Sequence, residues 1–166
     1  LRVFVGHKAN KSLIKTRQFK NILKKEGELM INNKKTYTSF VQYVSEFKQD
    51  FRKLIVDLKK RNKTIVGIGA PAKSVILLNF TDVNHTLISY ITDSTPYKQN
   101  RFMPGVHIPI MSEDKLELDS SIDYYLLLAW TYKDTILKKL RKLKNLRAKV
   151  IIPFPNNTYT SPNQST

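Results

Sequence analysis

The chain has 166 residues, 41% of them hydrophobic, and a formal net charge of +16 at pH 7. It is long enough for one domain with a sizeable core and too apolar for a disordered chain. The absence of cysteine excludes disulfides, thiolate zinc sites and cysteine nucleophiles, and it fits a reducing compartment.

The basic excess lies in residues 1–63 and 138–166, whereas the middle of the chain is slightly acidic. Lysines on helices with apolar opposite faces are typical of solvated surfaces, so we favour that interpretation over nucleic acid binding. Docking on an acidic partner domain and homo-oligomerisation stay open. No apolar run reaches the roughly 18 residues of a membrane span, and no signal sequence opens the chain. We therefore expect a cytoplasmic protein with no membrane partner.

The first part of the chain predicts a strand followed by helices. Residues 1–5 have the pattern of a strand, and we assign residues 1–10 to the end of a preceding domain that the chain lacks. Such an orphan edge strand is expected to be disordered or paired between molecules. Residues 12–30 have helical periodicity. Ser39 and Gln42 have the form of a capping box, and the apolar spacing after them predicts an amphipathic helix over residues 39–60.

From residue 64 the pattern changes to short apolar strands alternating with helices. Strands are predicted at 64–68, 86–92, 122–128 and 150–152, and a helix at 72–80. Thr131 and Asp134 can cap a further helix, whose core face is Ile136, Leu140 and Leu143. Residues 94–109 are a proline-bounded loop, and residues 156–166 are a polar tail that we expect to fray. This alternation predicts an α/β fold with a parallel sheet of about four or five strands.

The turn from residue 67 to residue 73 is the first candidate site. Gly67 and Gly69 let the backbone approach a ligand, and Ala70 leads into a helix whose first amides and dipole attract an anion. Lys73 would add a positive charge. The third glycine of a dinucleotide fingerprint is absent, since Ala72 takes its place. A phosphate cradle and a tight turn without a ligand are both consistent with this spacing.

Further candidates follow the second and third predicted strands. Asp93 ends the second strand, where an acidic side chain meets a ribose hydroxyl in doubly wound sheets, or else caps the next turn. Lys98, Arg101 and His107 lie in the loop beyond it and are either ligand-binding or ordinary solvated groups. Trp130 ends the third strand and either stacks on a base or sugar or covers the core edge. The three histidines are far apart in sequence, so no metal site is predicted.

Three long segments keep a recognisable pattern: residues 67–79 (GIGAPAKSVILLN), 92–110 (TDSTPYKQNRFMPGVHIPI) and 123–136 (DYYLLLAWTYKDTI). In order and spacing they resemble the C-terminal domain of S-adenosylmethionine-dependent sugar C-methyltransferases. Residues 1–3 and 153–155 are similar to the patterns at the start and end of that domain. Among the departures, Asn100 stands where the family has glycine.

The resemblance implies a Rossmann-like three-layer domain over residues 11–155, which includes the helices at 12–30 and 39–60. Enzymes of this family methylate a carbon of a nucleoside-diphosphate keto-sugar. Their S-adenosylmethionine site and bases belong to a central domain that this chain lacks, so the resemblance implies no catalytic residue and no cofactor here. The partners would be the nucleoside-diphosphate-sugar and the parent methyltransferase domain. The substrate-binding residues would be Gly67, Gly69, Ala70, Lys73, Asp93, Lys98, Arg101, His107 and Trp130. The alternative is a non-catalytic interaction module that keeps the fold but has lost the ligand.

Overall fold

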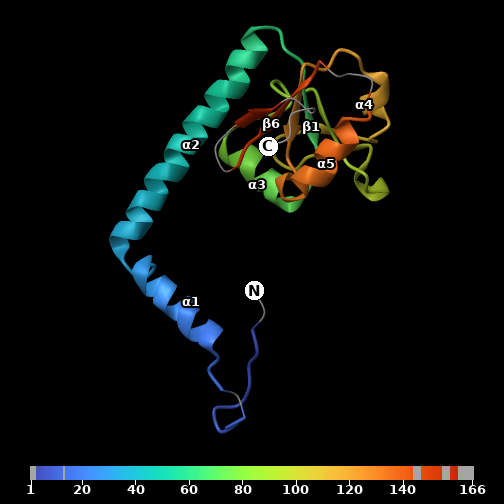
Figure 1. The fold of residues 1–166 in the computed structure, drawn as a ribbon. Coiled ribbons are helices and arrows are strands. Elements are labelled where there is room, and N and C mark those ends of the chain that lie inside the picture. The colour runs from blue at the N-terminus through green and yellow to red at the C-terminus, as the bar shows by residue number, and fades with distance from the viewer. Residues whose placement is uncertain (1–2, 13, 144–146, 155–157, 161–166) are drawn as a thin grey trace. The chain divides into compact units, whose positions relative to one another are not determined.

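A computed structural model describes residues 3–12, 14–143, 147–154 and 158–160 of the chain (Figure 1). The chain divides into two compact units, Leu1–Ser45 and Glu46–Thr166. The first unit holds α1 (Arg17–Glu28) and the beginning of α2 (Lys34–Lys60). The second unit holds the rest of α2 and the strands found among the described residues.

Helix α1 confirms the central part of the helix that the sequence predicts over residues 12–30. It begins after Thr16, whose Oγ1 accepts a hydrogen bond from the Phe19 amide at 3.2 Å. It ends before Met30, whose φ of +48° is left-handed. None of its residues is buried. Residues 3–5 are exposed and lie in no strand, while the first two residues of the predicted strand fall outside the described residues.

Helix α2 begins earlier than the sequence predicts. Asn33 precedes it and accepts a hydrogen bond from the Lys35 amide through Oδ1 at 2.9 Å, which satisfies a donor of the first turn. Ser39 lies inside the helix, where its hydroxyl donates to the Lys35 carbonyl at 3.2 Å. The prediction of a capping box at Ser39 and Gln42 is therefore wrong. The pattern misled because a helix can carry a serine in its interior when the hydroxyl bonds back to the preceding turn.

The second unit is built on a mixed sheet in the order β3-β4-β2-β1-β5-β6-β7. Strands β4, β2, β1, β5 and β6 run parallel, and β3 and β7 pair antiparallel at the two edges. The strands are β1 (Ile65–Ile68), β2 (Tyr90–Thr92), β3 (Arg101–Phe102), β4 (Pro109–Met111), β5 (Tyr124–Leu127), β6 (Lys149–Ile152) and β7 (Thr158–Thr160). The remaining helices are α3 (Ala72–Phe80), α4 (Lys115–Leu118) and α5 (Lys133–Leu140). Short 3-10 turns are η1 (Pro96–Lys98) and η2 (Trp130–Tyr132).

Each face of the sheet packs against its own helices, which confirms the predicted three-layer α/β fold. Phe51 and Ile55 of α2 and Leu78 of α3 belong to the core on one face. Leu116 of α4 and Leu137 of α5 belong to the core on the other. Successive strand residues alternate between these two cores, as they must in a pleated sheet. This explains why the buried strands are apolar throughout rather than alternating.

The sheet also differs from the prediction at three places. Strand β2 begins only at Tyr90, because Asn84 holds the preceding segment in a turn by accepting hydrogen bonds from the Thr86 amide and hydroxyl. The proline-bounded loop contains β3 and the first residue of β4, so it is partly a strand pair. The predicted polar tail contains β7, which pairs with β6; residues 161–166 lie outside the described part of the chain.

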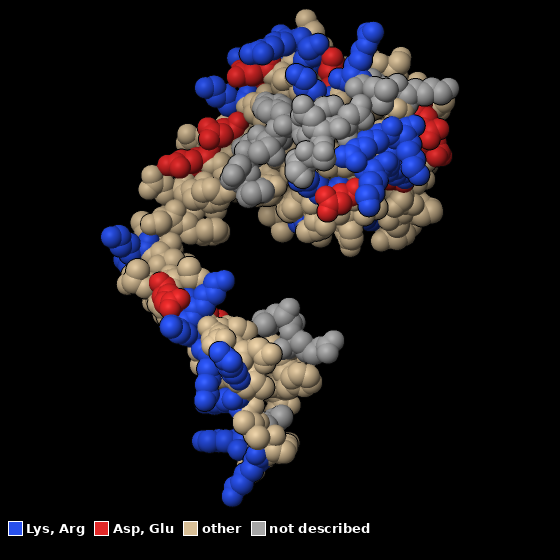
Figure 2. Space-filling view, in the orientation of Figure 1, with Lys and Arg blue, Asp and Glu red and all other residues tan. Residues whose placement is uncertain are grey.

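Basic side chains spread over both units in the view of Figure 2, mixed with uncharged and acidic ones. A group of them lies over α5, where Lys138 and Lys139 are exposed. Within the described residues, no helix is both long and apolar enough to cross a bilayer.

Candidate functional site

The central parallel strands end together at one margin of the sheet, which we name the carboxyl edge. β1 ends at Ile68, β2 at Thr92 and β5 at Leu127. The residues that follow these strands are close: the Gly69 amide donates to the Thr92 carbonyl at 2.7 Å, and the Ala129 amide donates to the Ile68 carbonyl at 3.1 Å. Ligands of open α/β sheets bind at this edge, which makes it the candidate site.

Packing alone requires Gly67, which lies inside β1, and Gly69, which lies in the turn that follows it. Gly69 has a φ of +86°, and a Cβ atom added there would lie 2.6 Å from Cβ of Ala129. A Cβ atom at Gly67 would lie 2.7 Å from Cγ1 of Ile91 and 2.8 Å from Cδ1 of Leu128. The tight-turn interpretation therefore suffices to explain the glycines, and their role in ligand binding stays a prediction.

Asp93, only 7% exposed, joins the ends of β1 and β2. Its Oδ2 accepts hydrogen bonds from the Ala70 amide at 2.7 Å and from Nζ of Lys98 at 3.3 Å, and its Oδ1 accepts from the Thr95 amide at 2.9 Å. Burial raises the pKa of the Asp93 carboxyl, but the hydrogen bonds from Thr95, Ala70 and Lys98 together outweigh burial, so the pKa lies below its usual value. Asp93 is thus an ionised cap of the next turn. Its role at a ribose hydroxyl stays a prediction, and such a hydroxyl would have to share these oxygens.

The proline-bounded loop is tied to the glycine turn by two further contacts. Nζ of Lys98 donates to the Ala70 carbonyl at 3.1 Å, and Nε2 of Gln99 donates to the Asp93 carbonyl at 2.9 Å. Asn100 follows with a φ of +60°, a left-handed conformation that asparagine tolerates better than most residues. This conformation explains why a glycine fits the same position in the family that the sequence resembles.

Lys73, in the first turn of α3, is the second cation at the carboxyl edge. Its Nζ donates to Oγ1 of Thr131 at 2.7 Å and lies 4.4 Å from the centroid of the Trp130 ring. Trp130 and Thr131 belong to η2, which follows β5. A face of the indole therefore already contacts an ammonium group, an arrangement favoured by the ring quadrupole.

The sequence does not predict the contact between Thr131 and Lys73. The sequence predicts that it caps the next helix with Asp134, but the N-cap of α5 is Tyr132, which supplies no side-chain hydrogen bond. The capping prediction is wrong because the chain first makes the 3-10 turn η2. Nothing in the spacing indicates that the threonine hydroxyl accepts from a lysine of a distant segment.

The structure separates His107 from the other predicted site residues. β3 runs away from the carboxyl edge and β4 returns toward it, so the turn between them lies at the opposite edge. In that turn the His107 amide donates to the Met103 carbonyl at 3.0 Å. Arg101 pairs with Ile110 near the carboxyl edge, but it is exposed and lies on the outermost strand. The residues that converge are Gly67, Gly69, Ala70, Lys73, Asp93, Lys98 and Trp130.

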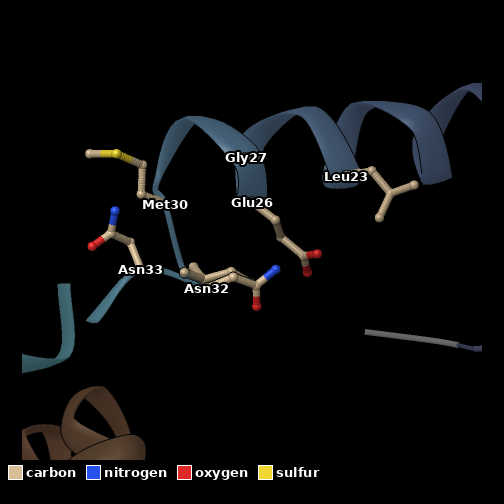
Figure 3. Close-up of a pocket in the computed structure, with 7 residues that line it drawn as sticks. Leu23, Glu26, Gly27, Met30, Asn32 and Asn33 are labelled. Carbon is tan, nitrogen blue, oxygen red and sulfur yellow. The ribbon is translucent and has the colours of Figure 1, made fainter. Parts of the chain in front are cut away.

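Neither a metal cluster nor a hollow elsewhere in the described residues adds to this candidate site. No three His, Asp or Glu side chains gather as a metal site among the residues that the structure describes. A hollow of about 440 Å³ lies in the first unit, at the end of α1 (Figure 3). Its lining residues are Leu23, Glu26, Gly27, Met30, Ile31, Asn32 and Asn33. It contains none of the predicted site residues, and we assign it no function.

Comparison with known proteins gives the same family over nearly the whole chain. Residues 1–155 match the family described as C-methyltransferase C-terminal domain. The C-methyltransferase NovU of Streptomyces niveus is 32% identical over 119 residues. The matched region covers 72% of this chain and 28% of NovU, so the chain spans little more than a quarter of that relative.

Proposed function

The chain belongs to the family of C-methyltransferase C-terminal domains, and from this premise we propose that it binds the nucleoside-diphosphate keto-sugar that the enzyme methylates. The observation that carries the proposal is the meeting of two lysines and a helix N-terminus at the carboxyl edge. Lys73 and Lys98 both reach this edge, one held by Thr131 and Trp130 and the other by Asp93 and Ala70.

The chemistry of this edge suits a diphosphate. Amide groups and the dipole at the start of α3 favour an anion, and Pro71, the N-cap of α3, supplies no side-chain hydrogen bond that would occupy those amides. The ammonium groups of Lys73 and Lys98 add charge-assisted donors. The sugar-nucleotide would therefore be held by its phosphates, and this chain would contribute orientation rather than proton transfer.

We further propose that S-adenosylmethionine, which supplies the methyl group, binds a portion of the enzyme outside this chain. The turn at Gly67 and Gly69 lacks the third glycine of a nucleotide fingerprint, and the Ala70 amide already donates to Asp93. The other three of the five glycines do not follow a parallel strand. The residues described here thus do not fit a second nucleotide-type cofactor.

Titration of nucleoside-diphosphate-sugars into a protein that includes the methyltransferase portion tests substrate binding. Lys73→Ala should weaken binding by about 5- to 150-fold, because one charge-assisted hydrogen bond contributes about 1–3 kcal/mol. Lys138→Ala removes an exposed lysine from α5 and should leave the affinity unchanged. Equal affinities for the parent protein and the Lys73 variant would remove the phosphate-binding role.

A non-catalytic interaction module remains the second candidate, favoured by one specific observation. The Ala70 amide, both Asp93 oxygens and the Lys73 ammonium all have partners within the protein. These four groups of the carboxyl edge are therefore paired without a ligand. If a protein that includes the methyltransferase portion binds no nucleoside-diphosphate-sugar, that result would favour this candidate.

A further inference from the structure

A row of aromatic side chains leads from α2 to the carboxyl edge within the second unit. Phe47 of α2 stacks on Phe154, with ring centroids 4.5 Å apart and planes inclined by 13°. Phe154 in turn lies 4.9 Å from the Trp130 ring, inclined by 51°. Nζ of Lys73 in turn lies 4.4 Å from the centroid of the Trp130 ring. Four segments that are remote in sequence are joined in this way.

Phe154 is the central member of this row. It is half-buried, lies two residues after the end of β6, and contacts both the Phe47 ring of α2 and the Trp130 ring of η2. Phe47 is 7% exposed and stacks on the fully buried Phe51, with ring centroids 5.8 Å apart. One end of the row is therefore fixed in the core, whereas the other end is the partly exposed Trp130.

The row has a consequence for Lys73. A lysine side chain has four rotatable bonds and needs contacts to hold its ammonium in one place. Here those contacts are the Trp130 ring and Oγ1 of Thr131. Trp130 and Thr131 are adjacent in η2, so a change in the indole orientation also changes the lysine's surroundings.

We propose that Phe154 is a positioning residue of the carboxyl edge, which fixes the Trp130 ring and through it the ammonium of Lys73. Only the expected effect on substrate binding rests on the proposed phosphate-binding role of Lys73. The positioning itself is a property of the protein without ligand and is tested that way.

The protein reports on this arrangement by itself, because Trp130 is its single tryptophan. Lys73→Met removes the ammonium and should change the emission of Trp130 in the 166-residue chain. The emission change caused by Lys73→Met should be strongly reduced when it is made together with Phe154→Leu. That substitution keeps an apolar side chain but removes the ring. Quenching of Trp130 by acrylamide should rise in Phe154→Leu, because the ring of residue 154 no longer lies against the indole.

Two further variants control the experiment. Phe154→Tyr keeps the ring and should restore the effect of Lys73→Met. Phe102→Leu makes the same exchange at a 64% exposed site on β3 and should leave the effect intact. If Phe154→Leu does not fold, as judged by circular dichroism, Phe154→Met takes its place. An effect of Lys73→Met that is equally large with and without the Phe154 ring would overturn the proposal.

Sugar-nucleotide titration separates this inference from the proposed function. If substrate binds, Phe154→Leu should weaken binding by about two- to five-fold while Phe154→Tyr leaves it unchanged. An emission coupling without any substrate binding would support the positioning role and contradict the proposed function. Substrate binding without the emission coupling would support the proposed function and contradict the positioning role of Phe154.

Discussion

Gly69→Ala adds one methyl group where neither the backbone nor the packing leaves room for it. The residue has a φ of +86°, and the new Cβ would lie 2.6 Å from Cβ of Ala129 and 3.5 Å from its backbone nitrogen. The Ala129 methyl is attached directly to the backbone between β5 and η2, so relief of this contact requires the backbone to move.

The two costs can be estimated separately. A left-handed backbone costs a residue with a side chain about 1–2 kcal/mol relative to glycine. Forcing an additional methyl group into a packed region costs about 1–3 kcal/mol. We therefore expect Gly69→Ala to lower the free energy of unfolding by about 2–5 kcal/mol, and Tm by about 4–20 °C for a chain of this size.

Thermal and urea unfolding followed by circular dichroism would measure this loss, with two controls. Gly27→Ala lies on α1 with no atom within 4 Å of the added Cβ, so it should not destabilise the protein. Ala129→Gly removes the clashing methyl, so it should recover the steric part of the loss when combined with Gly69→Ala, but not the backbone part. A loss below about 0.5 kcal/mol, the range of ordinary surface substitutions, would refute the reasoning.

Three further predictions follow from the geometry. The lowered pKa of Asp93 stabilises the fold above the unfolded value of about 3.9, and this contribution is lost as pH falls through the folded pKa. The free energy of unfolding measured with urea should consequently fall less steeply in Asp93→Asn than in the parent protein between about pH 5 and pH 3. An equal pH dependence of this free energy in the two proteins would contradict the reasoning. Asn33→Ala should increase hydrogen exchange in the first turn of α2, through loss of about 1 kcal/mol of capping, whereas Ser39→Ala should not. Calorimetric titration of S-adenosylmethionine into this chain should show no binding heat, and micromolar affinity would overturn the assignment of the cofactor to another portion of the enzyme.

The sequence predicts most elements but misplaces several of their ends. Helix α3 was predicted with its observed bounds, because a glycine turn before it and Thr81 after it limit the apolar run. The sequence predicts a start of α2 that is too late and a strand β2 that is too long. In both cases an asparagine side chain, Asn33 or Asn84, bonds to nearby amides and sets the boundary. Asn21, by contrast, lies inside α1, so the presence of an asparagine alone does not fix an end.

The sequence by itself determined the class of fold and the family. Buried strands must be apolar on both faces when helices cover both, and this pattern survives in a single sequence. The long motifs around Gly67, Asp93 and Trp130 also predicted which segments end at the carboxyl edge, because parallel strands end at the same side of a sheet.

Only the tertiary structure decided which side chains meet there. The strand pair β3 and β4 carries His107 to the opposite edge, although it is close in sequence to Lys98. Lys73, Thr131 and Phe154 come together through contacts between segments far apart along the chain. Such contacts depend on the crossing of strands and helices rather than on local spacing, because a side chain's partners are set by packing in three dimensions. Periodicity and motif spacing therefore carry no trace of them.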